Sequence, residues 1–423
     1  MGRILQIFKI PDLRKKVFYV LLGLVSFRAL GAIPVPGIDA ARLSEFLNSN
    51  QIFSFFNLFS GGGLSNLSIV MLGVGPYITA TIIMQLLTMI FPTLKVMYYE
   101  EGAIGRAKFN RISRYLTVPL AALQAYGFLN LLISQQIFTS LSGLGMLQNV
   151  IIVTTGSLLL TWIGELIGEQ KIGNGISLLI FAGIVQGLPS VIRNTVIGFD
   201  PANLPTYIAF VILSVLIIAG VVFVNQGERK VPISYSRRIR GNKVYGGVAS
   251  YLPLKINQAG VIPIIFAISI MLFPQFFAQI SSIFSPDFSV NLQNIVNQFL
   301  NNQIIYSAVY FALVVGFTYF YTSITFDPKE IAKNLQQSGG FVPGIRPGEP
   351  TGEFLKGLTK KLTFFGALFL GLIAVLPNLT QLLTGVQTLT IGGTALLIVV
   401  SVVLETIKQL DSELTMRQYE GLE

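Results

Sequence analysis

The sequence predicts an all-α polytopic membrane protein with about ten transmembrane helices. Hydrophobic residues make up 52% of its 423 residues and charged residues only 11%, whereas a soluble domain is about one quarter charged. Apolar stretches long enough to cross a bilayer recur along the whole chain. Lys and Arg are concentrated in every second connection between these stretches. Together the three observations indicate a helical bundle whose solvent is the bilayer.

The predicted spans are residues 17–38, 67–91, 115–138, 150–167, 176–197, 207–224, 261–280, 304–326, 362–376 and 388–404. The fourth, ninth and tenth are short, so we expect flanking residues to extend them. The first span follows a charged segment and lacks a small-residue cleavage site. We therefore interpret it as a retained span and not as a signal peptide.

The distribution of positive charge predicts the orientation of the chain. Most Lys and Arg residues lie in the N-terminal segment and in the second, sixth and eighth loops. The third and ninth loops contain neither residue. The positive-inside rule then places both termini of this multi-pass protein in the cytoplasm.

The composition excludes several classes of function. The chain has no Cys and no His, which removes disulfides, the usual metal sites and a Ser/His/Asp set. It has no Walker motif, so we predict no enzyme activity, no cofactor and no metal site. Arg28 is the clear charge within a predicted span, and this scarcity argues against a proton- or sodium-coupled carrier. Energy for transport would have to come from a partner.

Two predicted cytoplasmic loops, 226–257 and 327–361, are far longer than most connections between bundle helices. Both are basic, and the second contains the turn-rich segment 339–348, in which Arg346 lies close to two prolines. We interpret them as a docking surface for an acidic or RNA-bearing cytoplasmic partner. The alternative is a basic loop that only faces water and lipid headgroups.

Gly and Pro interrupt the second and seventh spans at Gly73-Val74-Gly75-Pro76 and at Gly260-Val261-Ile262-Pro263. These spans are equivalent if the chain is two inverted five-helix halves, 1–200 and 201–423. Paired interruptions in inverted halves indicate a pathway between them, although Gly and Pro are also common in membrane helices generally. An aliphatic constriction would suit an uncharged pathway, and segment 57–66 could fill it from the outer side.

The chain resembles the SecY family, the pore subunits of the bacterial Sec protein translocase. The resemblance extends from Val17 to about Glu420 and rests on long motifs. They are Phe27-Arg28, Ile33-Pro34-Val35-Pro36-Gly37-Ile38-Asp39, Phe59-Ser60-Gly61-Gly62, Pro76-Tyr77-Ile78, Ile172-Gly173-Asn174-Gly175-Ile176-Ser177, Leu252-Pro253-Leu254-Lys255, Ala259-Gly260-Val261-Ile262-Pro263, Phe341-Val342-Pro343-Gly344-Ile345-Arg346-Pro347-Gly348 and Gln418-Tyr419-Glu420.

The resemblance implies a clamshell of two five-helix halves around an hourglass pore that conducts unfolded secretory polypeptides and releases apolar segments sideways into lipid. The pore ring would be Val74, Ile78, Ile176, Ile180, Ile265 and Ile398. The plug would be Asn57, Leu58, Phe59, Ser60, Gly61, Gly62, Gly63, Leu64, Ser65 and Asn66. The lateral gate would have the second and third spans on one side and the seventh and eighth on the other. Its polar positions would be Thr79, Thr81 and Gln85.

The partners that the resemblance implies are the SecE and SecG membrane subunits, the SecA motor ATPase, the ribosome with its nascent chain, the signal peptides of secretory proteins and the lipid bilayer. The motor or the ribosome would dock on Arg237, Arg238, Arg240, Lys243, Lys255 and Arg346. The chain has Asp327-Pro328-Lys329 where the family often has Arg after Asn-Pro, and Lys cannot make a bidentate contact. Val74 stands where Ile is common in the ring.

Two other functions share part of this pattern. A secondary transporter of an uncharged solute would also have inverted halves and interrupted spans, but the scarce interior charges and the long basic loops argue against it. A membrane insertase or assembly factor without a continuous pore is the other alternative. Ion conductance after replacing ring residues by Gly would separate this alternative from a channel.

Overall fold

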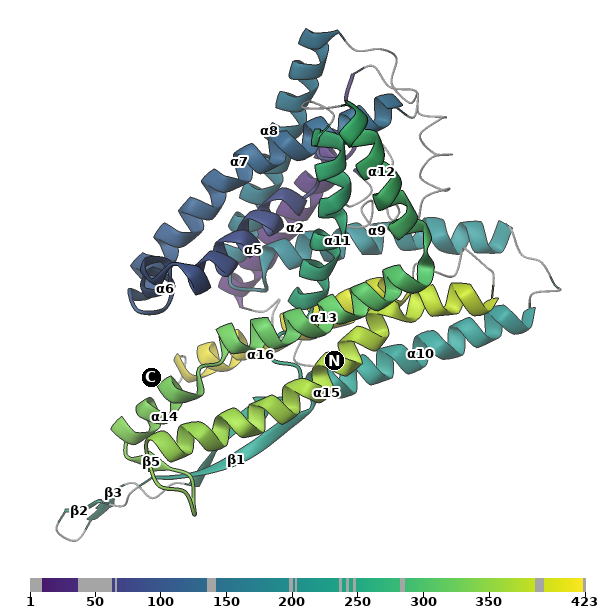
Figure 1. Cartoon of the computed structure of the whole chain (residues 1–423). Coiled ribbons are helices and arrows are strands. Elements are labelled where there is room, and N and C mark those ends of the chain that lie inside the picture. Colours follow the sequence, from purple (N-terminus) through teal and green to yellow (C-terminus); the bar gives the residue numbers. More distant parts are fainter. Residues whose placement is uncertain are drawn as a thin grey trace. The chain divides into compact units, whose positions relative to one another are not determined.

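The computed structural model describes residues 10–36, 63–64, 67–134, 142–197, 201, 204–235, 238–240, 243–245, 249–281, 286–384 and 392–420. These form two compact units (Figure 1). The first unit comprises Met1–Leu204, Ser269–Asn302 and Val402–Glu423, and the second comprises Pro205–Ile268 and Gln303–Ser401. The division after Leu204 lies near residue 200, whereas two later segments group with the first unit. The assignment of 1–200 and 201–423 as inverted halves stays a prediction.

Helices dominate the described part of both units. The first unit contains α2 (Pro11–Leu30), α5 (Gly75–Ile90), α6 (Pro92–Tyr99), α7 (Gly102–Ser134), α8 (Gly143–Glu169), α9 (Gly175–Ile197) and α12 (Pro286–Asn301). The second contains α10 (Leu204–Gln226), α13 (Gln303–Thr325), α14 (Pro328–Gln337) and α15 (Glu349–Thr384). Two helices, α11 (Ile262–Ile280) and α16 (Gly392–Glu420), run from one unit into the other.

Each predicted span overlaps one of these helices. Within the described residues, four helical segments are long and apolar enough to cross a membrane: Gly143–Glu169, Tyr207–Gln226, Gln303–Gln337 and Glu349–Thr380. The pair α5 and α6 passes the same test together, with a bend of 113° between them. Gly175–Pro189 and Ile262–Gln275 are shorter apolar helical segments. The expected extension of the short spans is confirmed, since α8, α15 and α16 have 27, 36 and 29 residues.

Two predicted spans extend several residues beyond their helices, and both errors involve Pro. The first span was expected to reach residue 38, but α2 ends at Leu30, shortly before Pro34 and Pro36, which cannot continue a helix. The second was expected to begin at Leu67, but residues 67–74 form turns and α5 begins at Gly75. Pro76 occupies the first turn of α5, where its missing N–H costs nothing. The predicted interruptions are confirmed, because α5 and α11 begin at them.

Ion pairs and aromatic contacts join the helices of the first unit. The Tyr98 ring lies 4.7 Å from the ring of buried Phe109, which fastens α6 to α7. Arg114 Nη1 of α7 lies 3.1 Å from Glu165 Oε2, so α7 contacts α8 near the end of α8. The buried side chains of Leu13 and Leu414 pack together, and the α2 residue Lys16 pairs with Glu413 of α16.

In the second unit α13 packs along α15, and α10 contacts α15 near Phe369 (Figure 1). Five short strands follow, β1 (Glu228–Tyr235), β2 (Arg238–Arg240), β3 (Lys243–Tyr245), β4 (Ala249–Lys255) and β5 (Gly340–Phe341). One antiparallel sheet has the order β4-β1-β5, with Val231 opposite Leu252 and Ser234 opposite Phe341. The second sheet pairs β2 with β3. Because β5 belongs to the eighth loop, the two long loops fold as one structure.

Candidate functional site

The chain immediately before α5 is a buried, non-helical strip. Leu64, Leu67, Val70 and Met71 each have 0% of their surface exposed. Backbone hydrogen bonds join the strip to the segment that follows α2, because Val35 N donates to Leu67 O (2.8 Å) and Ile69 N to Ile33 O (3.0 Å). Non-helical backbone at membrane depth is tolerated where protein buries it, which is the condition found here.

Helix α8 supports the other side of this strip through two adjacent small residues. The Ser157 hydroxyl donates to Gly73 O at 2.9 Å and is fully buried. At Gly156 an added Cβ would lie 2.0 Å from Ile69 O, so only Gly permits this approach. The strip therefore fixes where α5 begins, and with it the positions of Val74 and Ile78.

Four of the six predicted pore-ring residues lie in the first unit, as two pairs one helical turn apart. Val74 is the N-cap of α5, and Ile78 lies in its first turn. Ile176 and Ile180 lie in the first two turns of α9. Residues four apart share one face of a helix. Val74, Ile78 and Ile180 are buried.

The start of α9 is held by its own motif. Asn174 Oδ1 accepts hydrogen bonds from Ile176 N (3.1 Å) and Ser177 N (3.2 Å), an N-cap arrangement. An added Cβ at Gly175 would collide with the Gly164 carbonyl of α8. A Cβ at Gly164 would lie 2.5 Å from Ile176 Cδ1. The motif thus caps α9 and lets its backbone pack directly on α8, which fixes the Ile176 and Ile180 positions.

The other two predicted ring residues belong to the second unit. Ile265 lies in the first turn of α11 and is 7% exposed, and Ile398 lies in α16 and is 2% exposed. The assignment of all six residues to one ring stays a prediction.

The predicted gate positions are all on α5. The Thr79 and Thr81 hydroxyls donate to carbonyls of their own helix, Gly75 O (3.0 Å) and Tyr77 O (2.9 Å). Gln85 is buried, and its Oε1 has no hydrogen-bond partner among the described residues. Gln85 is thus the gate candidate with unused hydrogen-bonding capacity.

Most of the predicted plug, residues 57–66, lies outside the described residues. Gly63 and Leu64 are described, and both are buried. Gly63 O accepts from Ser68 N (2.8 Å) and from the Ser68 hydroxyl (3.1 Å). The C-terminal end of the predicted plug is therefore anchored to the strip before α5.

The long loops form a small folded structure, which we call the loop platform: β1, β4, β5, α14 and the first turns of α15. Its core consists of buried Val231, Leu254, Val342 and Leu355. Partly buried apolar side chains pack against this core, namely Leu252, Phe326, Ile331, Ile345, Leu358 and Leu362. Asp327 caps α14 by accepting from Lys329 N (2.9 Å) and Glu330 N (3.3 Å). Asp327 at this position thus has a structural role.

Arg346 is presented by a tightly held turn of the platform. Its neighbours Val342 and Ile345 pack into the platform core, and Ile345 N donates to Val342 O at 3.0 Å. The Thr351 hydroxyl donates to Arg346 O at 2.8 Å. Gly344 and Gly348 adopt φ of +84° and +97°, which favours Gly. The backbone is fixed, while the Arg346 side chain is exposed.

The other predicted docking residues are distributed over the strands. Lys255 ends β4 opposite Glu228 and is exposed. Arg238, Arg240 and Lys243 belong to strands β2 and β3, and Arg237 lies outside the described residues. Lys230 Nζ lies 4.8 Å from the centre of the exposed Tyr251 ring on β4. This cation–π pair was not among the predicted residues.

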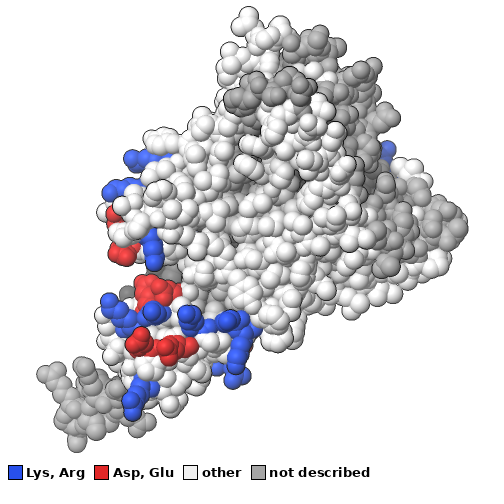
Figure 2. Space-filling view, viewed as in Figure 1, with Lys and Arg blue, Asp and Glu red and all other residues white. Residues whose placement is uncertain are grey.

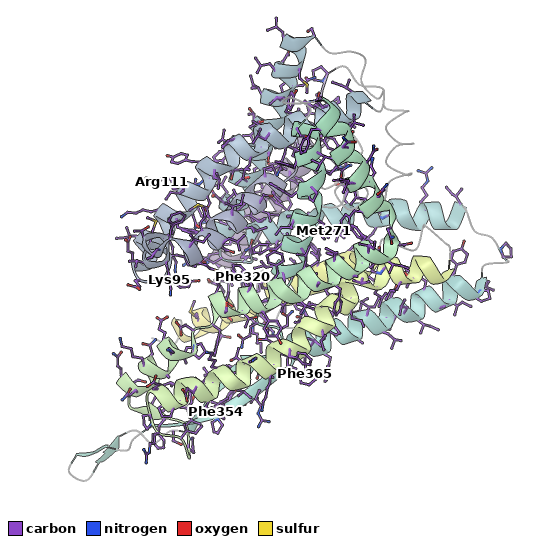
Figure 3. The ribbon with its side chains drawn as sticks, in the orientation of Figure 1. Lys95, Arg111, Met271, Phe320, Phe354 and Phe365 are labelled. Carbon is purple, nitrogen blue, oxygen red and sulfur yellow. The ribbon has the colours of Figure 1, made fainter. Side chains whose placement is uncertain are left out.

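Figure 2 shows charged side chains over α6 with the start of α7 in the first unit and, in the second unit, over the loop platform. Figure 3 shows Lys95 on α6 and Arg111 on α7 at the first of these places. Figure 3 also shows Phe354 and Phe365 along α15, and both are exposed, by 41% and 67%. The platform surface contains acidic as well as basic residues (Figure 2). Within the described residues, no group of acidic side chains could hold a metal ion.

The comparisons with known proteins agree with these features. The family model SecY matches residues 68–407, which is well over half of the chain. The chain belongs to the SecY family. A SecY protein translocase subunit from Corynebacterium glutamicum is 44% identical over 446 residues, covering 100% of both chains. The SecY subunit from Thermus thermophilus is 43% identical and covers 98% of this chain and 95% of its own.

Solved structures show the same fold. The structure of a protein conducting channel matches 94% of this chain with a TM-score of 0.66 at 23% identity and is covered to 92%. Sec61 from the canine ribosome-channel complex matches 94% with a TM-score of 0.63 at 22% identity, again covered to 92%. The chain is thus a multi-pass membrane protein with the fold of these channels.

Sequence reasoning missed three residues that build the site. Gly156 and Ser157 support the strip before α5, and their only signal was a pair of small residues inside an apolar span. Leu355 forms part of the platform core. It was missed because nearby Lys residues lower the local hydropathy, so the predicted ninth span begins only at residue 362.

Proposed function

We propose that this chain is the pore subunit of a bacterial protein translocase. It passes unfolded secretory polypeptides across the cytoplasmic membrane and releases hydrophobic segments sideways into the bilayer. The observation that carries the proposal is 44% identity over the full length of a SecY translocase subunit. Lateral release needs no bond chemistry, because apolar segments partition favourably into lipid and charged ones do not.

We further propose that both termini face the cytoplasm. The Lys16–Glu413 ion pair, with 3.2 Å between Nζ and Oε2, puts the start of α2 beside the last turns of α16. The Arg114–Glu165 pair likewise joins the basic N-terminal part of α7 to the end of α8. The first residues of α2 and of α7 contain more Lys and Arg than Asp and Glu. This surplus supports the cytoplasmic side.

The loop platform is the proposed docking surface for the partner that supplies energy, either the SecA motor ATPase or a translating ribosome with its nascent chain. A preorganised surface loses little conformational freedom on binding, and the platform has its own apolar core. Arg346 is a suitable contact because its backbone is fixed and its guanidinium can pair with a carboxylate or a phosphate. Arg237, Arg238, Arg240, Lys243 and Lys255 remain proposed contacts on the strands and their connections.

The remaining partners follow from the same proposal. Exposed apolar helix surfaces, such as Val211, Val215 and Phe223 on α10, face the bilayer or the SecE and SecG membrane subunits. Signal peptides would pass the gate positions Thr79, Thr81 and Gln85, where Gln85 has an unpaired buried oxygen within the described part of the chain. The pore ring would close around the translocating chain, with the plug at 57–66 on its outer side. The ring residues are Val74, Ile78, Ile176, Ile180, Ile265 and Ile398.

Removing ring side chains tests the pore. Replacement of Ile78 and Ile265 by Gly, singly and together, should raise the ion leak of the resting protein in planar bilayers, because branched side chains resist wetting of a closed pore. The matched control is Ile212→Gly on α10, where the side chain is 56% exposed. Equal conductance of the ring variants and the control would contradict the pore and favour an insertase.

Charge reversal tests the docking surface. Arg346→Glu should abolish motor-driven export, while the protein stays folded because the Arg346 side chain is exposed. Lys360→Glu, an exposed reversal elsewhere on α15, is the control and should keep most of the activity. Normal export by Arg346→Glu would refute the docking role.

A further inference from the structure

A chain of hydrogen bonds joins three elements of the second unit at the base of the loop platform. Asn257 Nδ2 donates to Asn225 Oδ1 at 2.8 Å and to Gly260 O at 3.1 Å. Asn225 Nδ2 in turn donates to Ser401 Oγ at 2.7 Å. Asn225 lies near the end of α10, and Ser401 lies on α16. We call Asn225, Asn257 and Ser401 the polar joint.

One side of the joint is attached to the platform. Asn257 follows β4 by two residues, and just before it Ile256 N donates to Gly227 O at 2.9 Å, which closes the base of the β1–β4 pair. An added Cβ at Gly366 of α15 would lie 2.7 Å from Ile256 O. The end of the sheet therefore lies directly on the α15 backbone. A displacement of the platform would move Asn257 as well.

The other side of the joint leads to the two predicted ring residues of this unit. The bond from Asn257 to Gly260 O spans the turn in which Gly260 has φ of +63°, and α11 begins two residues later with Ile265 in its first turn. Ser401 follows Ile398 by three residues on α16, so the two share a helix face. The joint thus connects the positions of Ile265 and Ile398 through two amides and one hydroxyl.

Two of the three joint residues are buried and Asn225 is half-buried, but the hydrogen bonding of the joint is incomplete. Asn257 is 6% exposed and Ser401 9%. Asn257 Oδ1 has no hydrogen-bond partner among the described residues. A buried acceptor without a partner costs free energy, so a second arrangement that paired this oxygen would gain that free energy. Coupling between two sites requires an element with two such arrangements.

We propose that Asn257 is a positioning residue of the channel, which transmits the state of the loop platform to α11 and α16 through Asn225 and Ser401. The inference rests on the proposed function and adds the route by which a docked partner alters the pore. A purely structural role would make the same residues important for folding alone. Partner binding, the resting leak and coupled transport must therefore be measured separately.

The functional experiment uses the full chain with its membrane subunit in vesicles. Asn257→Ala should leave motor binding unchanged, raise the resting ion leak about tenfold and lower transport per ATP hydrolysed to a similar extent. Ser401→Ala should act in the same direction, and Ser401→Thr should restore the parent values because it keeps a hydroxyl acceptor. The control is Thr161→Val on α8, a buried hydroxyl that bonds within its own helix. If both alanine variants have the same resting ion leak and the same transport per ATP as the control, the proposal is wrong.

A second measurement does not depend on transport or on the stability of one variant. The chain has no cysteine, so Tyr251→Cys on β4 and Phe273→Cys on α11 allow a clean pair of spin labels at exposed positions. Asn257→Ala and Ser401→Ala should each broaden or shift the distance distribution between the labels, and Ser401→Thr should not. An unaltered distribution in both alanine variants would refute the joint. Altered distances in a chain that supports no export would instead refute the proposed function.

Discussion

Gly156 offers a sharp test of how the strip before α5 is positioned. A methyl group at this position would lie 2.0 Å from Ile69 O, 2.7 Å from Ile69 C and 3.3 Å from Val70 N. Carbon and oxygen atoms rarely approach closer than about 3.3 Å. All three neighbours are backbone atoms, so no side-chain rotation relieves the overlap. In Gly156→Ala, α8 and the strip must separate by roughly 1 Å.

The expected cost has two parts. Overpacking a tight core costs about 1–3 kcal/mol. The separation also stretches the 2.9 Å bond from the buried Ser157 hydroxyl to Gly73 O, and a buried polar group left unpaired costs about 1–3 kcal/mol. The better helix propensity of Ala returns roughly 1 kcal/mol. We expect a net loss of about 3 kcal/mol, which is roughly a hundredfold in the folded-to-unfolded ratio.

The assay is unfolding of the purified protein in detergent, together with its resting ion leak in bilayers. Gly156→Ala should unfold at a clearly lower temperature and leak more, because the strip sets the Val74 and Ile78 positions. Gly316→Ala on α13 is the matched control, since no atom lies within 4 Å of its added Cβ, and it should be at least as stable as the parent. A Gly156→Ala protein with the stability and leak of that control would refute the close approach.

The remaining predictions concern the platform and the contact between the termini. Leu355→Ala should destabilise the platform by about 2–5 kcal/mol, because Leu355 is fully buried in its core, and should speed proteolysis of the platform loops. The platform loops of Phe354→Ala, whose side chain is 41% exposed, should be cleaved at the parental rate. Equal cleavage rates in both variants would contradict the position of Leu355 in the platform core. Glu413→Gln should cost about 1 kcal/mol or less and reduce the salt dependence of stability, because it removes the Lys16–Glu413 ion pair, whose solvent-accessible part salt screens. Unchanged salt dependence would count against that ion pair. Leu414→Ala should cost more than Glu413→Gln, since it empties the apolar contact with Leu13, and the reverse order would contradict that packing.

The sequence predicted the membrane helices well because hydropathy is a local property. Segment 207–224 was predicted almost completely, because the corresponding Tyr207–Gln226 is strongly apolar. Where a helix extends beyond its apolar segment into charged residues, hydropathy does not predict where the helix begins. Helix α15 begins at Glu349 and not at Leu362, because Lys356, Lys360 and Lys361 give its first turns a polar character.

The loop platform could not be predicted, since its sheet depends on contacts between distant residues. Ser234 pairs with Phe341 across more than 100 residues, and β5 has only two residues. Helix α12 was also missed and was expected to be loop. Its apolar residues recur at helical spacing, as at Leu292, Val296 and Leu300. They are too few for the hydropathy of this segment to indicate a membrane span. The ring, plug and docking residues rest on resemblance, because their roles depend on partners and on a substrate.

The most direct test of the account is export of a model secretory protein into vesicles that contain this chain and a SecE-type subunit, with and without SecA and ATP. The account predicts that the substrate becomes protected from external protease only when both the motor and ATP are present. Absence of protection, with folded protein and a motor that works on another translocase, would contradict the assignment of this chain as a protein-conducting channel.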